Sequence, residues 1–447
     1  MLKWLGILSI ILISSCSSGP TFSEDIAPIL AKNCSGCHNP EGIGPFSLLT
    51  YEHARIKAKT IAHVTANRFM PPWPADKNYT HFIGEKGLTD EEIDLIQQWV
   101  KNGSPEGKKL GKPIWEAKDK VERKPDMVLT LPEIEIQDDY TDRFYIVNIP
   151  GELPSNRYLQ SVHFIPEKPE LVHHFNGHLL LYEEGKKSKM PKTSAIEVGE
   201  GKFNKDYQRL GLLQDDNSLP LRVHSAVNYL PGVFGVHYPP GIGTVPLGKK
   251  FSFVGNDMHY GPSEKKASDQ SELHLFFTDQ APKRQLEELM LGTNGVDSGK
   301  IEPPLQIKPN TISRHVSKFQ INQDISVLTI NPHMHMLGKS FLAYALKPNG
   351  DTIRLINIPR WDFRWQYFYT FPKMVKIPKG SVIVAEGIYD NTRDNPNNPF
   401  DPPQLVGERY DYGGSSMRAT DEMFQFIITY TPYLPGDEEL ELSEKTE

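Results

Sequence analysis

Two cysteines and a histidine lie together in the run Cys34-Ser35-Gly36-Cys37-His38. This C-x-x-C-H pattern is typical of covalent c-type haem attachment, because the two thiols add to the two vinyl groups of one porphyrin and the adjacent histidine ligates the iron. A redox dithiol and half of a zinc site share the C-x-x-C spacing. A zinc site needs a second ligand pair nearby, and a redox dithiol needs a βαβ context, whereas the pattern here is helical. We therefore expect one haem c, bound through Cys34, Cys37 and His38.

A proline-rich run downstream offers a sixth ligand for that iron. Met70 lies in Arg68-Phe69-Met70-Pro71-Pro72-Trp73-Pro74, and the prolines fix the backbone of a loop that must present a thioether in one pose. Imidazole together with thioether raises the haem potential, which suits electron transfer. We expect Met70 to be the ligand, with His53, His63 and His81 as alternatives.

Helical patterns surround these ligands. The sequence predicts one helix over 22–33, a second over 50–67, and a third that begins at Thr89 with a capping box to Glu92 and stops at Gly103. This arrangement predicts a small all-α cytochrome c domain over residues 20–106. Residues 107–126, which mix Pro, Gly, Lys and Glu with few apolar positions, are expected to be a linker.

The N-terminal segment reads as an export signal. Lys3 precedes the apolar run 4–13, and Ser14 and Ser15 lead to Cys16, which is the order of a signal peptide and is too short to span a bilayer. Ile13-Ser14-Ser15-Cys16 also resembles a bacterial lipobox; the alternative is a plain signal peptide with a chance cysteine. We expect residues 1–16 to be a lipoprotein signal, Cys16 to be lipidated, and the protein to be exported, on the periplasmic side of the outer membrane or at the cell surface.

Composition limits the function further. The net charge is −7 and the isoelectric point is near 6.1, so the charge does not favour binding to nucleic acid. The chain has three cysteines, at 16, 34 and 37. The remainder of the chain therefore has no disulfide and must be held together by packing.

Beyond residue 127 the pattern changes from helical to strand-like. Short apolar runs alternate with Pro, Gly, Asn and Asp, and Pro348-Asn349-Gly350-Asp351 is typical of a hairpin turn. These runs predict an all-β body of about 310 residues, which is large enough for two sandwiches. We place the sandwiches at 127–285 and 286–435, followed by an acidic tail at 436–447. The predicted strands are 127–131, 144–149, 159–165, 178–182, 251–254, 273–277, 325–330, 340–347, 352–358, 381–385 and 423–430.

Three histidine groups in this body have spacings that could bind a metal. They are His173-His174, His259, and His333-Met334-His335. Alternate strand residues point to one face, so His333 and His335 can chelate one ion. Neighbours such as His173 and His174 can do so only at a strand end or a distortion. The histidines of an isolated H-x-H are more often hydrogen-bonded core or surface residues than metal ligands. We assign no metal site to six other histidines: His163, His178, His224, His237, His274 and His315.

The ligand types narrow the choice of metal. No thiolate remains in the β body, which excludes blue copper. Imidazoles suit copper or zinc, and a thioether favours Cu(I). A three-histidine zinc site with an open position stays an alternative.

The order of these motifs resembles one enzyme family. His-His, then His-Tyr, then His-x-His-x-x-Gly-Lys, then Asp-Glu-Met are similar to the copper type II, ascorbate-dependent monooxygenases, over roughly residues 127–435. The resemblance implies two jelly-roll sandwiches, each holding one copper. It places His173, His174 and His259 on the first copper, which stores an electron. It places His333, His335 and Met423 on the second, the catalytic copper, where O₂ binds and substrate C–H is broken; the alternative for Met423 is a core methionine.

The departures from the family concern the substrate. Its animal members are disulfide-rich, and this β body has no cysteine. Its peptide-hydroxylating members clamp a carboxylate with an arginine where this chain has Asn331, and with an asparagine and a tyrosine where it has Gln425 and Ile427. Without that bidentate anion clamp, a peptidylglycine substrate is not expected.

Together these features predict a haem- and copper-containing monooxygenase, in which a cytochrome c domain is fused to two β-sandwiches. It would hydroxylate an unidentified small organic or peptide-like substrate with O₂. Electrons would come from ascorbate or a periplasmic donor, through the chain's own haem, whose tethering raises the effective concentration of the donor. Two alternatives stay open: a non-catalytic electron-transfer or copper-handling lipoprotein, and a surface-binding module with structural metals.

Overall fold

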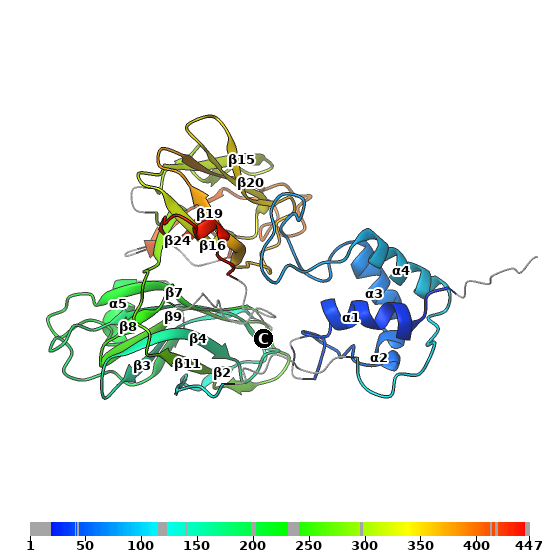
Figure 1. The fold of residues 1–447 in the computed structure, drawn as a ribbon, viewed down its shortest axis with the longest axis horizontal. Coiled ribbons are helices and arrows are strands. Elements are labelled where there is room, and N and C mark those ends of the chain that lie inside the picture. Colours follow the sequence, from blue (N-terminus) through cyan, green and yellow to red (C-terminus); the bar gives the residue numbers. More distant parts are fainter. Residues whose placement is uncertain are drawn as a thin grey trace, which may run out of the picture. The chain divides into compact units, whose positions relative to one another are not determined.

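A computed structural model of the chain divides into two compact units (Figure 1). The first unit comprises Met1–Pro40, Phe46–Pro71 and Gly87–Lys118, and the second comprises Glu41–Pro45, Pro72–Lys86 and Asp119–Glu447. The structure describes residues 19–40, 42, 44–114, 123–139, 141–197, 203–230, 241–295, 298–411, 414–415 and 419–442. The predicted signal segment and Cys16 lie outside this range. Among the described residues, no helix combines the length and apolar character needed to cross a membrane.

The first unit is helical where it is described. Its elements are η1 (Phe22–Ile26), α1 (Ala27–Asn33), α2 (Tyr51–Ile56), α3 (Ala58–Ala66) and α4 (Asp90–Lys101). Two of the predicted helices are broken: residues 22–33 start as a π-helical turn before α1, and residues 50–67 are interrupted at Lys57, which is not helical. The third prediction is confirmed, because Thr89 and Glu92 form the reciprocal capping box of α4.

One apolar cluster holds these helices together. Phe22 is 1% exposed and Trp99 is 0% exposed, and their ring centres are 6.2 Å apart. Ile96 belongs to the same cluster, on the apolar face of α4. The Trp99 indole donates to the carbonyl of Pro105 at 3.0 Å, so the polar edge of the ring is satisfied at the rim of the core.

The second unit is mostly β. Its first sandwich has a five-stranded sheet in the order β6-β3-β9-β5-β7 and a four-stranded sheet in the order β1-β11-β4-β8, with β10-β2 as a separate pair. The strands are β1 (Met127–Thr130), β2 (Ile134–Ile136), β3 (Arg143–Glu152), β4 (Arg157–Ile165), β5 (Val172–Leu181), β6 (Ser194–Glu197), β7 (Leu221–Tyr229), β8 (Val245–Leu247), β9 (Lys250–Tyr260), β10 (Ala267–Asp269) and β11 (Glu272–Thr278). Phe164 of β4 stacks on Phe175 of β5 with ring centres 4.6 Å apart, which joins the two sheets across one core.

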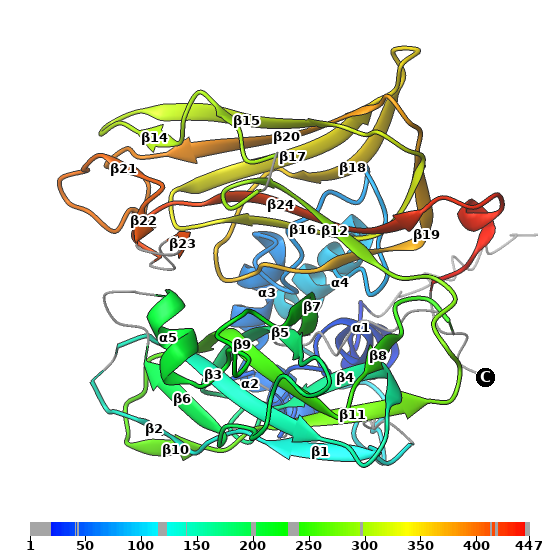
Figure 2. The same cartoon turned by 90° about the vertical axis from the view of Figure 1, so that its left-hand side faces the viewer.

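The second sandwich has the same plan, and Figure 2 shows its two sheets as stacked layers. One sheet has the order β12-β24-β16-β19 and the other β13-β15-β20-β17-β18, with two short pairs, β14-β21 and β22-β23. The strands are β12 (Glu287–Gly292), β13 (Ile301–Glu302), β14 (Gln306–Ile307), β15 (Ile312–Gln320), β16 (Ile325–Met334), β17 (Gly338–Leu346), β18 (Thr352–Ile358), β19 (Tyr369–Ile377), β20 (Val382–Asp390), β21 (Val406–Gly407), β22 (Tyr410–Asp411), β23 (Gly414–Ser415) and β24 (Phe424–Pro432). Phe341 packs on Phe424 and Phe426 between the layers, at ring distances of 5.7 and 5.6 Å.

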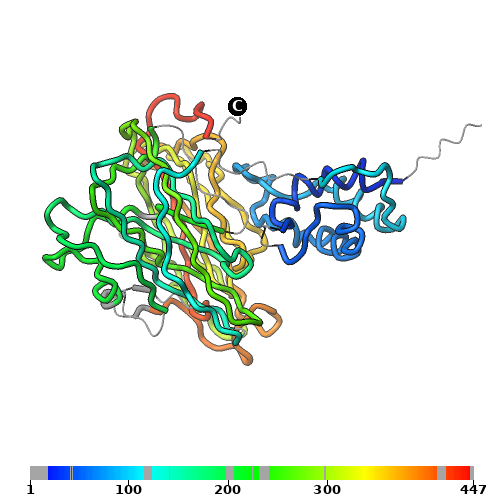
Figure 3. The backbone as a smooth tube through the Cα atoms, turned by 90° about the horizontal axis from the view of Figure 1, so that it is seen from below, coloured from blue at the N-terminus to red at the C-terminus, as the bar shows by residue number. Residues whose placement is uncertain are grey.

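Each predicted strand overlaps an observed one, and β18 has the predicted bounds. Three details differ from the sequence analysis. A short helix, α5 (Phe203–Arg209), interrupts the β body. The predicted acidic tail is packed where it is described: Asp437 and Leu442 are buried, and η2 (Asp437–Glu439) contacts β19. The segment Pro72–Lys86, placed by sequence in the helical domain, belongs to the second unit; Figure 3 follows the backbone through it.

Candidate functional site

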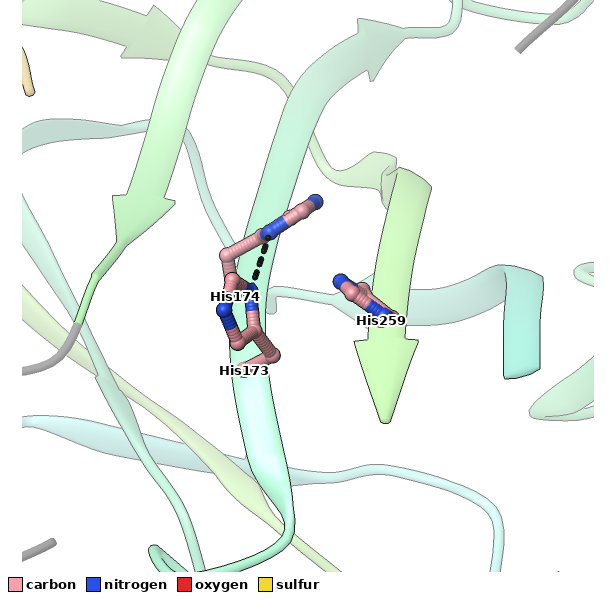
Figure 4. A group of neighbouring side chains, drawn as sticks. All are labelled: His173, His174 and His259. Carbon is pink, nitrogen blue, oxygen red and sulfur yellow. Dashed lines mark hydrogen bonds between the residues drawn. The ribbon is translucent and has the colours of Figure 1, made fainter. Parts of the chain in front are cut away.

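Three histidines of the first sandwich converge at the start of β5. His173 and His174 come from β5 and His259 from β9, and one ligand atom from each ring lies within 4.8 Å of the others (Figure 4). His174 is paired directly with His259, and the register between β5 and β9 shifts at His173. That bulge inserts one residue, so two sequence neighbours that would face opposite ways in a regular strand reach the same site.

The ring nitrogens of this cluster are arranged for a metal. Nε2 of His259 hydrogen-bonds Asp142 at 2.8 Å, and Nε2 of His174 hydrogen-bonds Asp257 at 2.8 Å. Each carboxylate accepts the ring N–H and thereby leaves the lone pair on Nδ1. Nδ1 of His259 is buried without a hydrogen-bond partner. Nδ1 of His173 and Nδ1 of His174 are 3.2 Å apart, close to the ~3.3 Å expected for two imidazoles bound tetrahedrally at about 2.0 Å.

Burial favours the neutral form of His173 and His259. It lowers the pKa of His173 to about 3, helped by the neighbouring rings of His259 and His174. Burial also lowers the pKa of His259, although the Asp142 carboxylate opposes the shift. The pKa of Asp257 is raised by burial but held below its ordinary value overall by the rings of His174 and His259 and the amide of Asn176. A neutral imidazole offers its lone pair without losing a proton first.

The second histidine pair lies at the end of β16. His333 is the penultimate residue of β16 and His335 follows its end, with ring centres 5.0 Å apart. Nδ1 of His333 hydrogen-bonds the side-chain oxygen of Gln366, and Nδ1 of His335 hydrogen-bonds the Asp421 carbonyl at 2.8 Å. Both rings therefore carry their lone pair on Nε2, since each acceptor fixes the proton on Nδ1.

The electrostatics of the two histidine groups are linked. The pKa of His333 is lowered to about 3, first by burial and then by His335. Smaller effects come from the first sandwich: Asp257 raises this pKa and His174 lowers it. Burial is the largest cause, so the ring of His333 favours its neutral form and keeps a lone pair for a metal.

Met423 lies where the register of β16 and β24 places it beside His335. The ladder pairs His333 with Gln425 and Met334 with Phe424, so the next pair along is His335 with Met423, although β24 begins one residue later than predicted, at Phe424. In a regular antiparallel ladder opposed side chains share a face, so an extension of this register would put Met423 on the same face as His333 and His335. Met423 is 2% exposed, yet among the described residues it belongs to none of the buried apolar clusters.

Glu422 ties the two ligand segments together. Its carboxylate accepts the backbone N–H groups of His335 at 2.9 Å, Leu337 at 2.7 Å and Met423 at 3.3 Å. Burial raises the pKa of Glu422 to about 8, against the lowering effect of these three donors. The side chain is 2% exposed, so it acts as an internal clamp between the end of β16 and the start of β24.

The C-x-x-C-H run of the first unit follows α1. Cys34 and Cys37 are free thiols, and burial raises the pKa of Cys34 to about 12. Nδ1 of His38 hydrogen-bonds the carbonyl of Phe46 at 2.9 Å, and the Phe46 ring packs on the imidazole at 4.8 Å. This leaves the lone pair on Nε2, the atom an iron would need, so the residues fit a haem ligand set.

Met70 lies four residues beyond α3 and is partly buried, with its backbone N–H on the carbonyl of Val64. The alternative ligands are on the surface: His53 and His63 are exposed on α2 and α3. His81 is also exposed and pairs with Glu85 in the second unit. The role of Met70 as an iron ligand stays a prediction.

Sequence reasoning missed the acceptors of the ring N–H groups, Asp142, Asp257 and Gln366, and the backbone acceptor Glu422. Only Glu422 and Asp257 carried a signal, since each lies within two residues of a predicted ligand. Several histidines given no site have ordinary partners. His178 contacts Tyr207 and Asn256, His274 pairs with Glu272, and His315 bonds the carbonyl of Pro303. His237 and the side chain of His224 lie outside the described part.

Comparisons with known proteins bear on part of this unit. Residues 288–399 match the family model for the C-terminal domain of copper type II ascorbate-dependent monooxygenases. The matched range contains His333 and His335 and ends before Met423. No curated protein matches the chain.

Two virus capsid structures are similar at low level. The major capsid protein P2 from bacteriophage PM2 is 8% identical, over 70% of this chain and 99% of that one, with a TM-score of 0.25. The infectious bursal disease virus VP2 subviral particle is 10% identical, over 70% of this chain and 72% of that one, with a TM-score of 0.17. Likenesses at these scores carry no argument about function.

Proposed function

We propose that the protein is a copper-dependent monooxygenase that hydroxylates a C–H bond with O₂. The observation that carries the proposal is the convergence of His173, His174 and His259, with Nδ1 of His259 buried and unpartnered. A buried imidazole nitrogen without a partner costs free energy unless something occupies it. The family match over 288–399 supports a copper oxidoreductase and covers the second histidine pair.

Copper fits the donor sets better than zinc. The first site offers three imidazoles, and for the second we propose two imidazoles together with the Met423 thioether, one residue beyond the pairing of Met334 with Phe424. A thioether is a poor zinc ligand and a good ligand for Cu(I). We therefore assign one copper to His173, His174 and His259, and one to His333, His335 and Met423.

Copper in these sites would supply electron storage at the first and O₂ reduction coupled to C–H cleavage at the second. The overall reaction consumes R–H, O₂, two electrons and two protons, and yields R–OH and water. The chain's own side chains prepare both sites: Asp142, Asp257 and Gln366 fix the ring tautomers, and burial keeps His173 and His333 neutral. Orientation by such acceptors typically contributes 10- to 100-fold in metal affinity.

The haem site completes the proposal. We propose that Cys34 and Cys37 hold one haem c, with His38 and Met70 as its axial ligands, and that this haem receives electrons from ascorbate or a periplasmic donor. The hydrogen bond from His38 to Phe46 supports the assignment because it directs Nε2 to a metal. Lipidation at Cys16 would hold the exported protein at a bacterial membrane.

The substrate differs from that of the peptide-hydroxylating relatives. The positions that would clamp a carboxylate are engaged elsewhere: Asn331 donates to the carbonyl of Tyr367 at 3.0 Å, and Gln425 donates to the carbonyl of Thr293 at 2.8 Å. Neither side chain brings a positive charge. We therefore propose a neutral organic or peptide-like substrate.

The test is metal content followed by O₂ consumption. Purified, haem-loaded protein should bind about two copper ions and one iron per chain, the stoichiometry of two type-II copper sites with one haem. His259→Ala and His335→Ala should each lose one copper. Candidate substrates are then screened for substrate-dependent O₂ uptake with ascorbate. Iron without copper after copper loading would overturn the proposal. Two coppers that cycle with haem but never accelerate O₂ uptake would favour the non-catalytic electron-transfer protein.

A further inference from the structure

The segment Pro72–Lys86 is built into the second sandwich. Ala75 and Phe82 are 5% and 4% exposed and belong to that sandwich's core cluster, and Trp73 packs against it. The backbone is also fixed, because Asp76 donates to the carbonyl of Asn357 at 2.8 Å and Ile83 to that of Thr370 at 2.8 Å. A surface loop that only connected two helices would need neither contact.

The start of this segment packs on an aromatic group that leads to the second metal site. The Trp73 ring lies 5.5 Å from that of Tyr367 and 5.4 Å from that of Tyr369. The Tyr367 hydroxyl donates to the carbonyl of Pro72 at 3.0 Å. Gln366, the residue before Tyr367, accepts the hydrogen bond from the ring of His333. The carbonyl of Tyr367 is also held, by the side chain of Asn331.

The sequence joins this aromatic group directly to Met70. Met70, the proposed iron ligand, precedes Pro72 by two residues. From Met70 the chain therefore runs through two prolines to Trp73, across a ring contact to Tyr367, and through Gln366 to His333. We propose that this path delivers electrons from the haem to the second metal site, before the first. The inference rests on the proposed function and adds to it which copper the haem supplies.

The electron balance is simple. A one-electron donor, ascorbate in the experiment, reduces ferric haem to ferrous haem. One electron then passes to Cu(II) held by His333, His335 and Met423, which gives ferric haem and Cu(I). No bond is made or broken and no proton moves in this step, so its rate depends on the path and on the two potentials.

The experiment measures that electron directly. Protein loaded with haem and Cu(II), and freed of unbound copper, is mixed anaerobically with less than one equivalent of ascorbate. The haem absorbance band then follows reduction of the haem and its reoxidation by bound Cu(II), and this reoxidation is the fast phase. Metal content and the haem spectrum are measured first, so that failure of the proposed function, which is missing copper or missing haem, is seen separately. We expect His335→Ala to abolish the fast phase and His259→Ala to keep it.

Variants on the path complete the test. Trp73→Leu should slow the fast phase tenfold or more while the haem potential and copper content stay unchanged. Phe82→Leu is the matched control, because it removes an aromatic ring from the same segment but contacts Tyr369 and Phe371, off the path. If Trp73→Leu does not fold, Tyr367→Phe takes its place, because it keeps the ring and removes the hydroxyl that bonds the Pro72 carbonyl, and a smaller decrease is expected. Loss of the fast phase in His259→Ala but not in His335→Ala, or equal rates in Trp73→Leu and Phe82→Leu, would overturn the inference.

Discussion

Replacing Glu422 with glutamine should weaken copper binding at the second proposed site, His333–His335–Met423, and leave binding at the first site unchanged. The carboxylate accepts three buried backbone N–H groups, from His335, Leu337 and Met423, at 2.9, 2.7 and 3.3 Å. A glutamine keeps one accepting oxygen and turns an NH₂ group toward the remaining donors. One or two buried N–H groups then lose their acceptor, and each such loss costs about 1–3 kcal/mol.

Above the Glu422 pKa of about 8, where the side chain is ionised, the free energy of unfolding of Glu422→Gln should therefore fall by about 2–4 kcal/mol. The same change loosens the link between His335 and Met423. Copper affinity at the second site should drop by about 10- to 100-fold, the usual effect of losing a residue that orients metal ligands. The first site should be unaffected, because Glu422 contacts none of its histidines.

Urea unfolding and copper titration check both numbers. The titration is run in a His259→Ala background, so that only the second site binds. Glu287→Gln serves as the control: this exposed carboxylate accepts only from Tyr430 at 2.7 Å, and an amide oxygen can replace it, so the change should stay within about 0.5 kcal/mol. Copper affinity that is unchanged in Glu422→Gln, in a folded protein, would refute the reasoning.

Three further predictions concern stability. Asp437→Asn should cost about 3 kcal/mol in urea unfolding, because it breaks the buried pair with Arg284. Burial raises the Asp437 pKa, but the hydrogen bonds from Arg284, Leu434 and Ser326 hold it below 3.8 overall. The deficit should therefore be full above pH 3.8 and shrink as pH falls through the folded pKa, and a pH-independent deficit would contradict the assignment. Gly255→Ala would place its Cβ 2.3 Å from the Phe175 ring and should lower the melting temperature through about 1–3 kcal/mol of overpacking, whereas an unchanged melting temperature would show that the ring can shift. Copper chelation should lower the free energy of unfolding by about 2.7 kcal/mol for each of the two sites, relative to protein held at copper a hundredfold above Kd, and His259→Ala should remove the contribution of the first site.

The strands were predictable because their causes are local. β18 is found at its predicted bounds, and β16 overlaps the apolar run that predicted it. Alternation of apolar residues and turn residues such as Asn349-Gly350 depends on nearby sequence alone. The helix from Thr89 was predictable for the same reason, since both halves of its capping box lie within four residues.

The orienting contacts were not predictable because they join distant segments. Gln366 reaches His333 across 33 positions, and Asp142 reaches His259 across 117. The bulge at His173 likewise depends on how β5 pairs with β9. The sequence predicted that neighbouring histidines need a distortion to share a metal, but only the pairing of the two strands locates it.

The packing of Pro72–Lys86 illustrates the same limit with a functional consequence. The prolines after Met70 were interpreted as stiffening a haem-ligand loop, and nothing in the local pattern distinguished that role from docking on a sheet. The distinction lies in the partner, because Trp73 and Phe82 bury their rings against Tyr367, Tyr369 and Phe371. Burying such rings is favourable where they pack against an apolar surface. If the proposed haem assignment holds, the loop must fix the Met70 thioether on one side and Trp73 on the other, and the consecutive prolines between them serve both by restricting the backbone.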